Sequence, residues 1–204
     1  MAKVPKLPSD SPEEIVSSFF RKKFPEIYRK VQLQVRRTPR RQTGRYKTNR
    51  ESRWKLPSHH PDYTAAGQIP RIEAKLFAMA LELDGAPDLP ENVTTAGKRI
   101  LGHPVKPGSY HCPITGRAMS FKEMLREAKK PKHGRSSFHV GHVRPKALGG
   151  INEPGNTYWT TDLGNRIQGD KSWVETVKII VEMAEYHRSA AKISWEEMVN
   201  RYRA

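Results

Sequence analysis

The sequence predicts an α+β protein in which a basic, mainly helical N-terminal part precedes a C-terminal part made of two short strands and a helix. Three observations lead to this class. Apolar residues recur at helical spacing in several capped segments. A run that carries two histidines enters a loop rich in proline and glycine, "FHVGHVRPKALGG". A short apolar stretch and a helical turn then follow. We place the division near residue 108, with an extension over 1–107 and a compact domain over 108–204.

Two helices are expected in the N-terminal part. The first begins after Ser11, which can cap it, and Glu14 completes a capping box. Its apolar stripe consists of Ile15, Phe19 and Phe20. The second is expected near residues 69–83, where an Asp-Gly pair and a proline stop it. Its stripe consists of Ile72, Leu76, Met79 and Leu83, and both stripes predict core packing.

The stretch between these helices is the most basic part of the chain. It opens with alternating apolar residues, Val31, Leu33 and Val35, which predict a strand. Residues 36–55 are rich in arginine and contain a single acid, Glu51. A charge run is usually a solvated face or a disordered segment. Because arginine favours bidentate contact with phosphate and guanine edges, we expect instead a DNA-binding arm that orders on contact.

The rest of the chain is turn-rich at first and then regular. Residues 87–107 show no clear pattern, and "YHCPITGRAMSF" predicts two short strands around a Thr115-Gly116 turn. A short helix follows, with a capping box from Ser120 to Glu123. Two more helices are expected near residues 172–188 and 194–203. The first of them has a stripe that predicts core packing: Trp173, Val177, Ile180, Val181 and Ala184.

Composition limits the classes of partner. The formal net charge is +16 and the pI is about 10.1, so a polyanion is the favoured partner, although ribosome-associated and membrane-surface proteins share such a charge. Cys112 is the single cysteine, which excludes an internal disulfide framework and any zinc site built on cysteine pairs. No segment has the pattern of a signal peptide or a membrane span, so we expect a cytoplasmic protein.

The histidine motif carries the chemistry. Two antiparallel strands and a helix can bring His142 and Asn165 to one point. A neutral imidazole can take a proton from water, and nearby arginines lower its pKa and favour that form. An amide oxygen is a hard ligand that suits Mg²⁺, which also binds phosphate oxygens. This combination is typical of phosphodiester hydrolysis.

These residues resemble the HNH, or ββα-metal, endonucleases. The resemblance covers residues 112–172 and rests on "GHVRPKALGG", "GNTYW" and "GNRIQGD" in that order. It implies a ββα-metal core with His142 as the general base and Asn165 as the metal ligand. It also implies that Asn156 braces the loop between the strands. One divalent ion would be bound, Mg²⁺ in the first place and Mn²⁺ or Ni²⁺ as alternatives, without a structural zinc.

The chain departs from the family pattern at three positions. Gly141 stands where many members have a metal-binding aspartate, His139 where some have an acid, and Gln168 where a basic residue is common. Lys171 or Arg166 could contact phosphate in place of that basic residue.

For several single residues a purely structural role competes with the functional one. His139 should face away from His142 on a regular strand, so packing or DNA-backbone contact is favoured over metal binding. Asn165 could be an ordinary helix-capping asparagine. We assign structural roles to five further histidines: His59, His60, His103, His133 and His187.

The sequence as a whole predicts a metal-dependent endonuclease of double-stranded DNA, with restriction activity favoured and a homodimer as its working form. The residues expected to bind nucleic acid are Arg36, Arg37, Arg40, Arg41, Arg45, Arg144, Lys146 and Arg166. One alternative is a phage or mobile-element nuclease that nicks DNA or cuts branched DNA. Another is a non-catalytic nucleic-acid-binding module.

Overall fold

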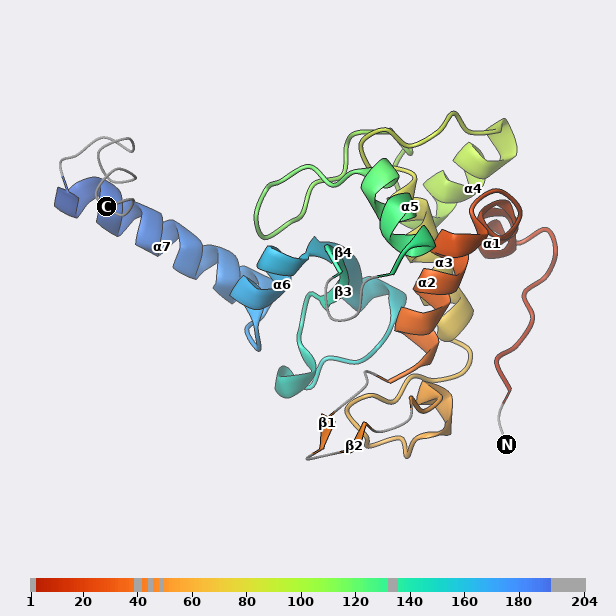
Figure 1. The fold of residues 1–204 in the computed structure, drawn as a ribbon, viewed down its shortest axis with the longest axis horizontal. Coiled ribbons are helices and arrows are strands. Elements are labelled where there is room, and N and C mark those ends of the chain that lie inside the picture. Colours follow the sequence, from red (N-terminus) through yellow and green to blue (C-terminus); the bar gives the residue numbers. More distant parts are fainter. Residues whose placement is uncertain (1–2, 39–41, 44–45, 48–49, 132–135, 192–204) are drawn as a thin grey trace.

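The computed structural model describes residues 3–38, 42–43, 46–47, 50–131 and 136–191, and it confirms the α+β class (Figure 1). A group of helices packs beside a small two-stranded antiparallel sheet. The elements are α1 (Pro12–Lys23), α2 (Pro25–Arg36), β1 (Gln42–Thr43), β2 (Tyr46–Lys47), η1 (Arg53–Lys55), α3 (Ile69–Ala80), α4 (Glu91–Leu101), α5 (Phe121–Lys129), β3 (Phe138–His142), η2 (Lys146–Leu148), η3 (Pro154–Asn156), β4 (Thr157–Thr161), α6 (Asp162–Gln168) and α7 (Trp173–Ala191).

Helix α1 confirms its predicted start. The Ser11 hydroxyl accepts a hydrogen bond from the backbone N–H of Glu14 at 3.2 Å. Phe20 is fully buried, and its ring stacks on Phe77 of α3 with 4.8 Å between the ring centroids. The capped end and the buried aromatic face together fix α1 against α3.

The strand predicted over residues 31–35 is wrong, because these residues lie in α2. Val31 and Val35 are buried, whereas Leu33 is 50% exposed. An alternating triplet also satisfies the helical i, i+4 relation, and the buried Ile27 extends that row by one more turn. Pro25 at the first position favours a helix start, so the helical period prevails.

Helix α3 lies at the centre of the core, as its stripe predicts. Ile72, Leu76 and the residues around them are buried. The indole N–H of Trp159 in β4 donates to the backbone oxygen of Leu76 at 2.8 Å. The core is therefore continuous across residue 108 and ties the small sheet to the helical part.

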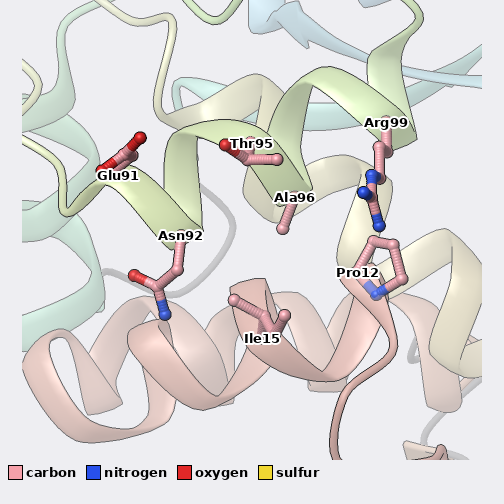
Figure 2. A pocket seen from close by; sticks show the side chains of 7 residues that line it. All are labelled: Pro12, Ile15, Glu91, Asn92, Thr95, Ala96 and Arg99. Atoms are coloured by element: carbon pink, nitrogen blue, oxygen red, sulfur yellow. The ribbon is translucent and has the colours of Figure 1, made fainter.

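The turn-rich stretch 87–107 contains α4, which packs against α1 through Val93 and Ala96. Gly97 allows a close approach, since a Cβ there would lie 2.6 Å from a methyl carbon of Val105. A cavity of about 320 Å³ remains between the two helices, and Figure 2 shows its lining: Pro12, Ile15, Glu91, Asn92, Thr95, Ala96 and Arg99. This cavity contains no residue of the histidine motif.

The predicted hairpin over residues 110–121 is present only in part. A single bridge joins His111 and Ala118, and the turn places Gly116 at a φ of 66°. Two strands do not form because the chain enters α5 directly after the bridge. The predicted cap of α5 is confirmed, since the Ser120 hydroxyl accepts from the N–H of Glu123.

The histidine motif forms the larger antiparallel pair. In the register of β3 and β4, His139 lies opposite Thr160, Gly141 opposite Tyr158 and His142 opposite Thr157. Helix α6 follows β4 immediately and packs against both strands. Two strands, the loop 143–156 and α6 thus form one compact unit.

The core packing predicted for the stripe of α7 is wrong. Helix α7 extends away from the body of the protein (Figure 1), and over residues 173–188, whose burial is described, Thr176 alone is buried while Ile180 is half-buried. Val177 and Val181 are 36% and 48% exposed. The stripe lies on a helix that the body contacts mainly at its first turns. Within the described residues, no helix is long and apolar enough to cross a membrane.

Candidate active site

His142 is the last residue of β3, where the strand enters the loop. Its Nε2 atom lies 2.7 Å from Oδ1 of Asn152. The Asn152 amide nitrogen donates to the backbone oxygen of Tyr63 at 2.9 Å. The imidazole is therefore held by a loop residue that is itself fastened to the N-terminal part of the chain.

Burial is the main cause that lowers the pKa of His142, and the positive charges of Lys146 and Arg53 add to it. The hydrogen bond to Asn152 and the charge of Asp62 act in the opposite direction but do not outweigh these causes. The imidazole is consequently neutral at neutral pH, which is the form that can accept a proton.

The charges beside His142 form an ion cluster that the sequence did not indicate. The Arg53 guanidinium lies 3.0 Å from Asp62 Oδ1, and the Lys146 ammonium lies 2.6 Å from the same oxygen. Arg53 and Asp62 are buried. Lys146, predicted to bind phosphate, thus makes an ion pair within the protein.

Asn156 connects both ends of the loop that follows His142. Its Oδ1 accepts from the N–H of Arg144 at 2.7 Å, and its Nδ2 donates to the oxygens of Arg144 and Ile151, each at 2.9 Å. The side chain is buried, so its donors and its acceptor are used within the loop. These three bonds fix the path of the chain just beyond β3.

Gln168 fixes the backbone of His142 from the side of α6. Its amide nitrogen donates to the His142 oxygen at 2.7 Å, and its amide oxygen accepts from the Tyr158 hydroxyl at 2.5 Å. Gln168 is buried and therefore does not face solvent as a phosphate-binding residue would.

The Tyr158 ring also accounts for the glycine before His142. A Cβ at Gly141 would lie 2.8 Å from Cζ of Tyr158, a distance that real side chains do not tolerate. An aspartate at position 141 would require this ring to move. The strand thus has a tyrosine ring beside the position where many HNH endonucleases have a metal ligand.

Asn165 lies one helical turn before Gln168 on α6, and its side chain is exposed. Among the described residues its amide has no hydrogen-bond partner, so its oxygen faces solvent. Helix α6 runs along β3, since Asp162 at its start lies 3.5 Å from His139 and Gln168 at its end donates to the His142 oxygen. Asn165 lies between these two positions on α6. No direct contact joins the side chains of Asn165 and His142.

The remaining polar residues of α6 and β3 interact with one another. His139 Nε2 lies 2.7 Å from the Ser136 oxygen and 3.5 Å from Asp162 Oδ1. Arg166, another predicted phosphate contact, lies 2.7 Å from Asp162 Oδ2 and is exposed. His139 and His142 thus contact different parts of the protein.

The donors that could hold a metal ion are few. No cluster of three histidine, cysteine or acidic side chains with metal-binding geometry occurs in the described ranges. The exposed amide oxygen of Asn165 suits Mg²⁺, which keeps several waters and takes the rest of its ligands from substrate phosphates. A single exposed amide oxygen is a donor that one hydrated hard cation could use.

The other residues predicted to contact DNA differ in how the structure places them. The Arg36 guanidinium makes a bidentate ion pair with the buried Glu73, so its Nε and one Nη donate within the protein. Arg37 donates to the Ser52 hydroxyl and Arg144 to the Leu148 oxygen. Arg40, Arg41 and Arg45 lie outside the described residues. Lys171 is exposed beyond the end of α6.

A cavity of about 460 Å³ lies beside the loop that holds His142. Asn152, Lys146 and Tyr63 line it, together with residues of the segment 58–68. Sequence reasoning missed Asn152, Asp62 and Tyr63, because no motif connects them with the histidine. Residues from both parts of the chain line this cavity, but His142 and Asn165 are not among them.

No family model and no curated protein matches this chain. Among solved structures, one described as a type II restriction endonuclease is similar, with a TM-score of 0.51 and 17% sequence identity. The alignment covers 68% of this chain and 62% of that chain, so less than two thirds of the neighbour is matched. The likeness shows a shared fold.

Proposed function

We propose that the protein is a metal-dependent endonuclease of double-stranded DNA with a single histidine general base. The observation that carries the proposal is a neutral, hydrogen-bonded imidazole at the end of β3, beside the helix that presents Asn165. A fold shared with a restriction endonuclease supports it. The site is of the HNH, or ββα-metal, type.

In this mechanism His142 takes a proton from a water molecule as the water oxygen attacks phosphorus. The bond from phosphorus to the 3′ oxygen breaks, and the departing oxygen gains a proton from solvent. The products are a 5′-phosphate and a 3′-hydroxyl. Asn156 and Gln168 keep the strand end in place while the imidazole gains its charge.

Asn165 would hold the divalent ion through its amide oxygen. A bound Mg²⁺, or Mn²⁺ or Ni²⁺ in its place, supplies charge that stabilises the pentacovalent phosphate and the leaving oxygen. The chain supplies the rest: an exposed amide on α6 and a strand end held by Gln168.

The net charge of +16 favours binding along a phosphate backbone. Arg37, Arg144 and Arg166 are the described candidates, together with the arginines of the arm. A sequence-specific restriction enzyme is the form we favour. It would act as a homodimer, because one site per chain must otherwise cut the two strands in turn.

A non-catalytic DNA-binding module is the second candidate, and the glycine packed against Tyr158 favours it, since an acid at position 141 would have to displace the tyrosine ring. Digestion of supercoiled plasmid with Mg²⁺ distinguishes the two. The proposed enzyme cuts the plasmid, EDTA stops it, and discrete bands indicate a recognition sequence, whereas open circles indicate nicking. Binding without cleavage in Mg²⁺, Mn²⁺ and Ni²⁺ would replace the proposal with the module.

A further inference from the structure

We propose that Asn152 is a positioning residue that sets the tautomer of His142, so that Nδ1 is the atom that takes the proton from water. This inference rests on the proposed function for its catalytic meaning. Its structural part, the tautomer, stands on hydrogen bonds alone. Residues 63, 142 and 152 are brought together only by the fold.

The first step is the orientation of the Asn152 amide. A backbone oxygen can only accept a hydrogen bond. Because the Tyr63 oxygen lies 2.9 Å from the Asn152 side chain, the atom facing it must be the amide nitrogen. The amide oxygen of Asn152 therefore faces His142.

The second step is the protonation of the ring. The Asn152 oxygen is also only an acceptor, so the His142 Nε2 atom, 2.7 Å away, must carry the hydrogen. In a neutral imidazole the other nitrogen then has a free lone pair. Within the described part of the chain no hydrogen bond occupies Nδ1, so its lone pair has no protein partner.

The charges around the ring act on its pKa but do not choose the tautomer. Arg53 from η1, Lys146 from η2 and Asp62 from the loop before α3 are the charged groups that act on His142. Two positive charges and burial keep the ring neutral, and the Asn152 bond then decides which nitrogen is the base. A neutral amide is suited to this role because it orients the ring without raising its pKa as strongly as a carboxylate would.

The tautomer can be measured on the protein without DNA or metal. Long-range ¹H–¹⁵N correlation spectra of ¹⁵N-labelled protein at neutral pH should show His142 with a protonated Nε2 and an unprotonated Nδ1. A protonated Nδ1 in the wild-type protein would overturn the inference. Because this readout needs no activity, it remains decisive even if the proposed nuclease activity fails.

Variants of Asn152 test the functional part. Asn152→Leu removes the acceptor, and we expect kcat to fall by about 10–100-fold while DNA affinity stays unchanged. Asn152→Asp keeps the acceptor and adds a charge, so the tautomer should persist while the acid limb of the pH–rate profile moves to higher pH. Asn92→Ala, an asparagine on α4 away from the motif, is the control. Unchanged tautomer and pH profile in both Asn152 variants would refute a positioning role.

The outer face of α7 carries a second, independent inference: we infer that it pairs with α7 of a second copy of the chain. Val174, Val177 and Val181 recur on this face and are 74%, 36% and 48% exposed. A contiguous exposed apolar stripe on a helix normally marks a surface that packs against another element or another protein. The buried Thr176 and half-buried Ile180 lie on the opposite side, toward the body.

The charges on this face favour an antiparallel pair of identical helices. With a two-fold axis between residues 181 and 182, Lys178 of one copy lies opposite Glu185 of the other, and the pair occurs twice. A parallel pair would place Lys178 against itself. Helix α7 carries three glutamates, Glu175, Glu182 and Glu185, against Lys178 and Arg188, so DNA is not a suitable occupant.

Light scattering coupled to size exclusion tests the pairing. The wild-type protein should be a dimer, and Val181→Glu should yield monomers because two carboxylates meet at the axis. Lys178→Glu should also weaken the dimer, and adding Glu185→Lys should restore it. A monomeric wild-type protein, or a double variant no more dimeric than Lys178→Glu alone, would overturn the inference. Circular dichroism checks that each variant is folded.

Discussion

The two sides of the candidate active site are built differently. On the loop side, His142, Asn152 and Asn156 each have defined hydrogen-bond partners, and Asn156 is buried. On the outer face of α6, Asn165 and Arg166 are exposed. The group proposed to move a proton is thus fixed before substrate arrives, whereas the group proposed to hold a metal faces solvent. A base held in fixed geometry would favour the proposed phosphodiester hydrolysis, and the exposed amide would leave room for a hydrated ion.

Replacing His142, on the fixed side of the site, should reduce the cleavage rate more than any other substitution. The His142→Ala variant lacks the general base, so the single-turnover cleavage rate should fall by about 10²–10⁴-fold. DNA binding, measured by gel shift, should persist because the basic surface is unchanged. His103→Ala, which replaces an exposed histidine on another part of the protein, is the control and should cut normally.

Replacing Asn165 should abolish metal-dependent cleavage without affecting the fold. The side chain is exposed and has no hydrogen-bond partner among the described residues, so the thermal midpoint of Asn165→Ala should equal that of the wild type. Cleavage should require far more Mg²⁺ or disappear, as a Mg²⁺ titration would show. An unchanged Mg²⁺ dependence would remove Asn165 from the site.

Replacing Asn156, unlike replacing Asn165, should lower the stability of the fold. Asn156→Ala leaves buried loop groups without partners, which typically costs about 1–3 kcal/mol for an unsatisfied group. We expect that loss of unfolding free energy in urea, together with slower cleavage. Asn156→Asp keeps the acceptor for Arg144 N–H and loses the donors, so its stability should lie between the two. Wild-type stability in Asn156→Ala would show that the loop does not depend on this brace.

The smallest expected effect is the contribution of His142 to the pH dependence of the unfolding free energy. Burial holds the pKa of folded His142 below its ordinary value, so the unfolded chain binds a proton first as pH falls. Stability should therefore decrease below the ordinary histidine pKa of about 6.5, by at most about 1.4 kcal/mol per pH unit, until folded His142 also titrates. Above that pKa the contribution is constant. The dependence should be weaker in His142→Ala, and an equal dependence in both proteins would assign it to other groups.

The sequence predicted the parts of this fold that local rules determine. The cap at Ser11, the stripe of α3 and the pairing of β3 with β4 all follow from short-range patterns. The pattern at residues 31–35 was misread because an alternating triplet also fits one face of a helix. The stripe of α7 was recognised as apolar, but periodicity does not indicate what covers a face.

The site was predictable only along the motif. His142, Asn156 and Asn165 stand in a recognisable order, so their approximate placement could be expected. The contact between Asn152 and Tyr63 joins residues far apart in the chain, and no local signal predicts it. Gln168 likewise acquires its role from Tyr158 and from the backbone of His142, which only the fold brings together.

Chemical rescue of a His142→Gly variant tests the central claim most directly. Plasmid cleavage by this variant should be very slow, and added imidazole should restore it increasingly as pH rises and more of the added base is neutral. DNA binding should be unaffected throughout. Cleavage at the wild-type rate without imidazole would contradict the assignment of His142 as the general base.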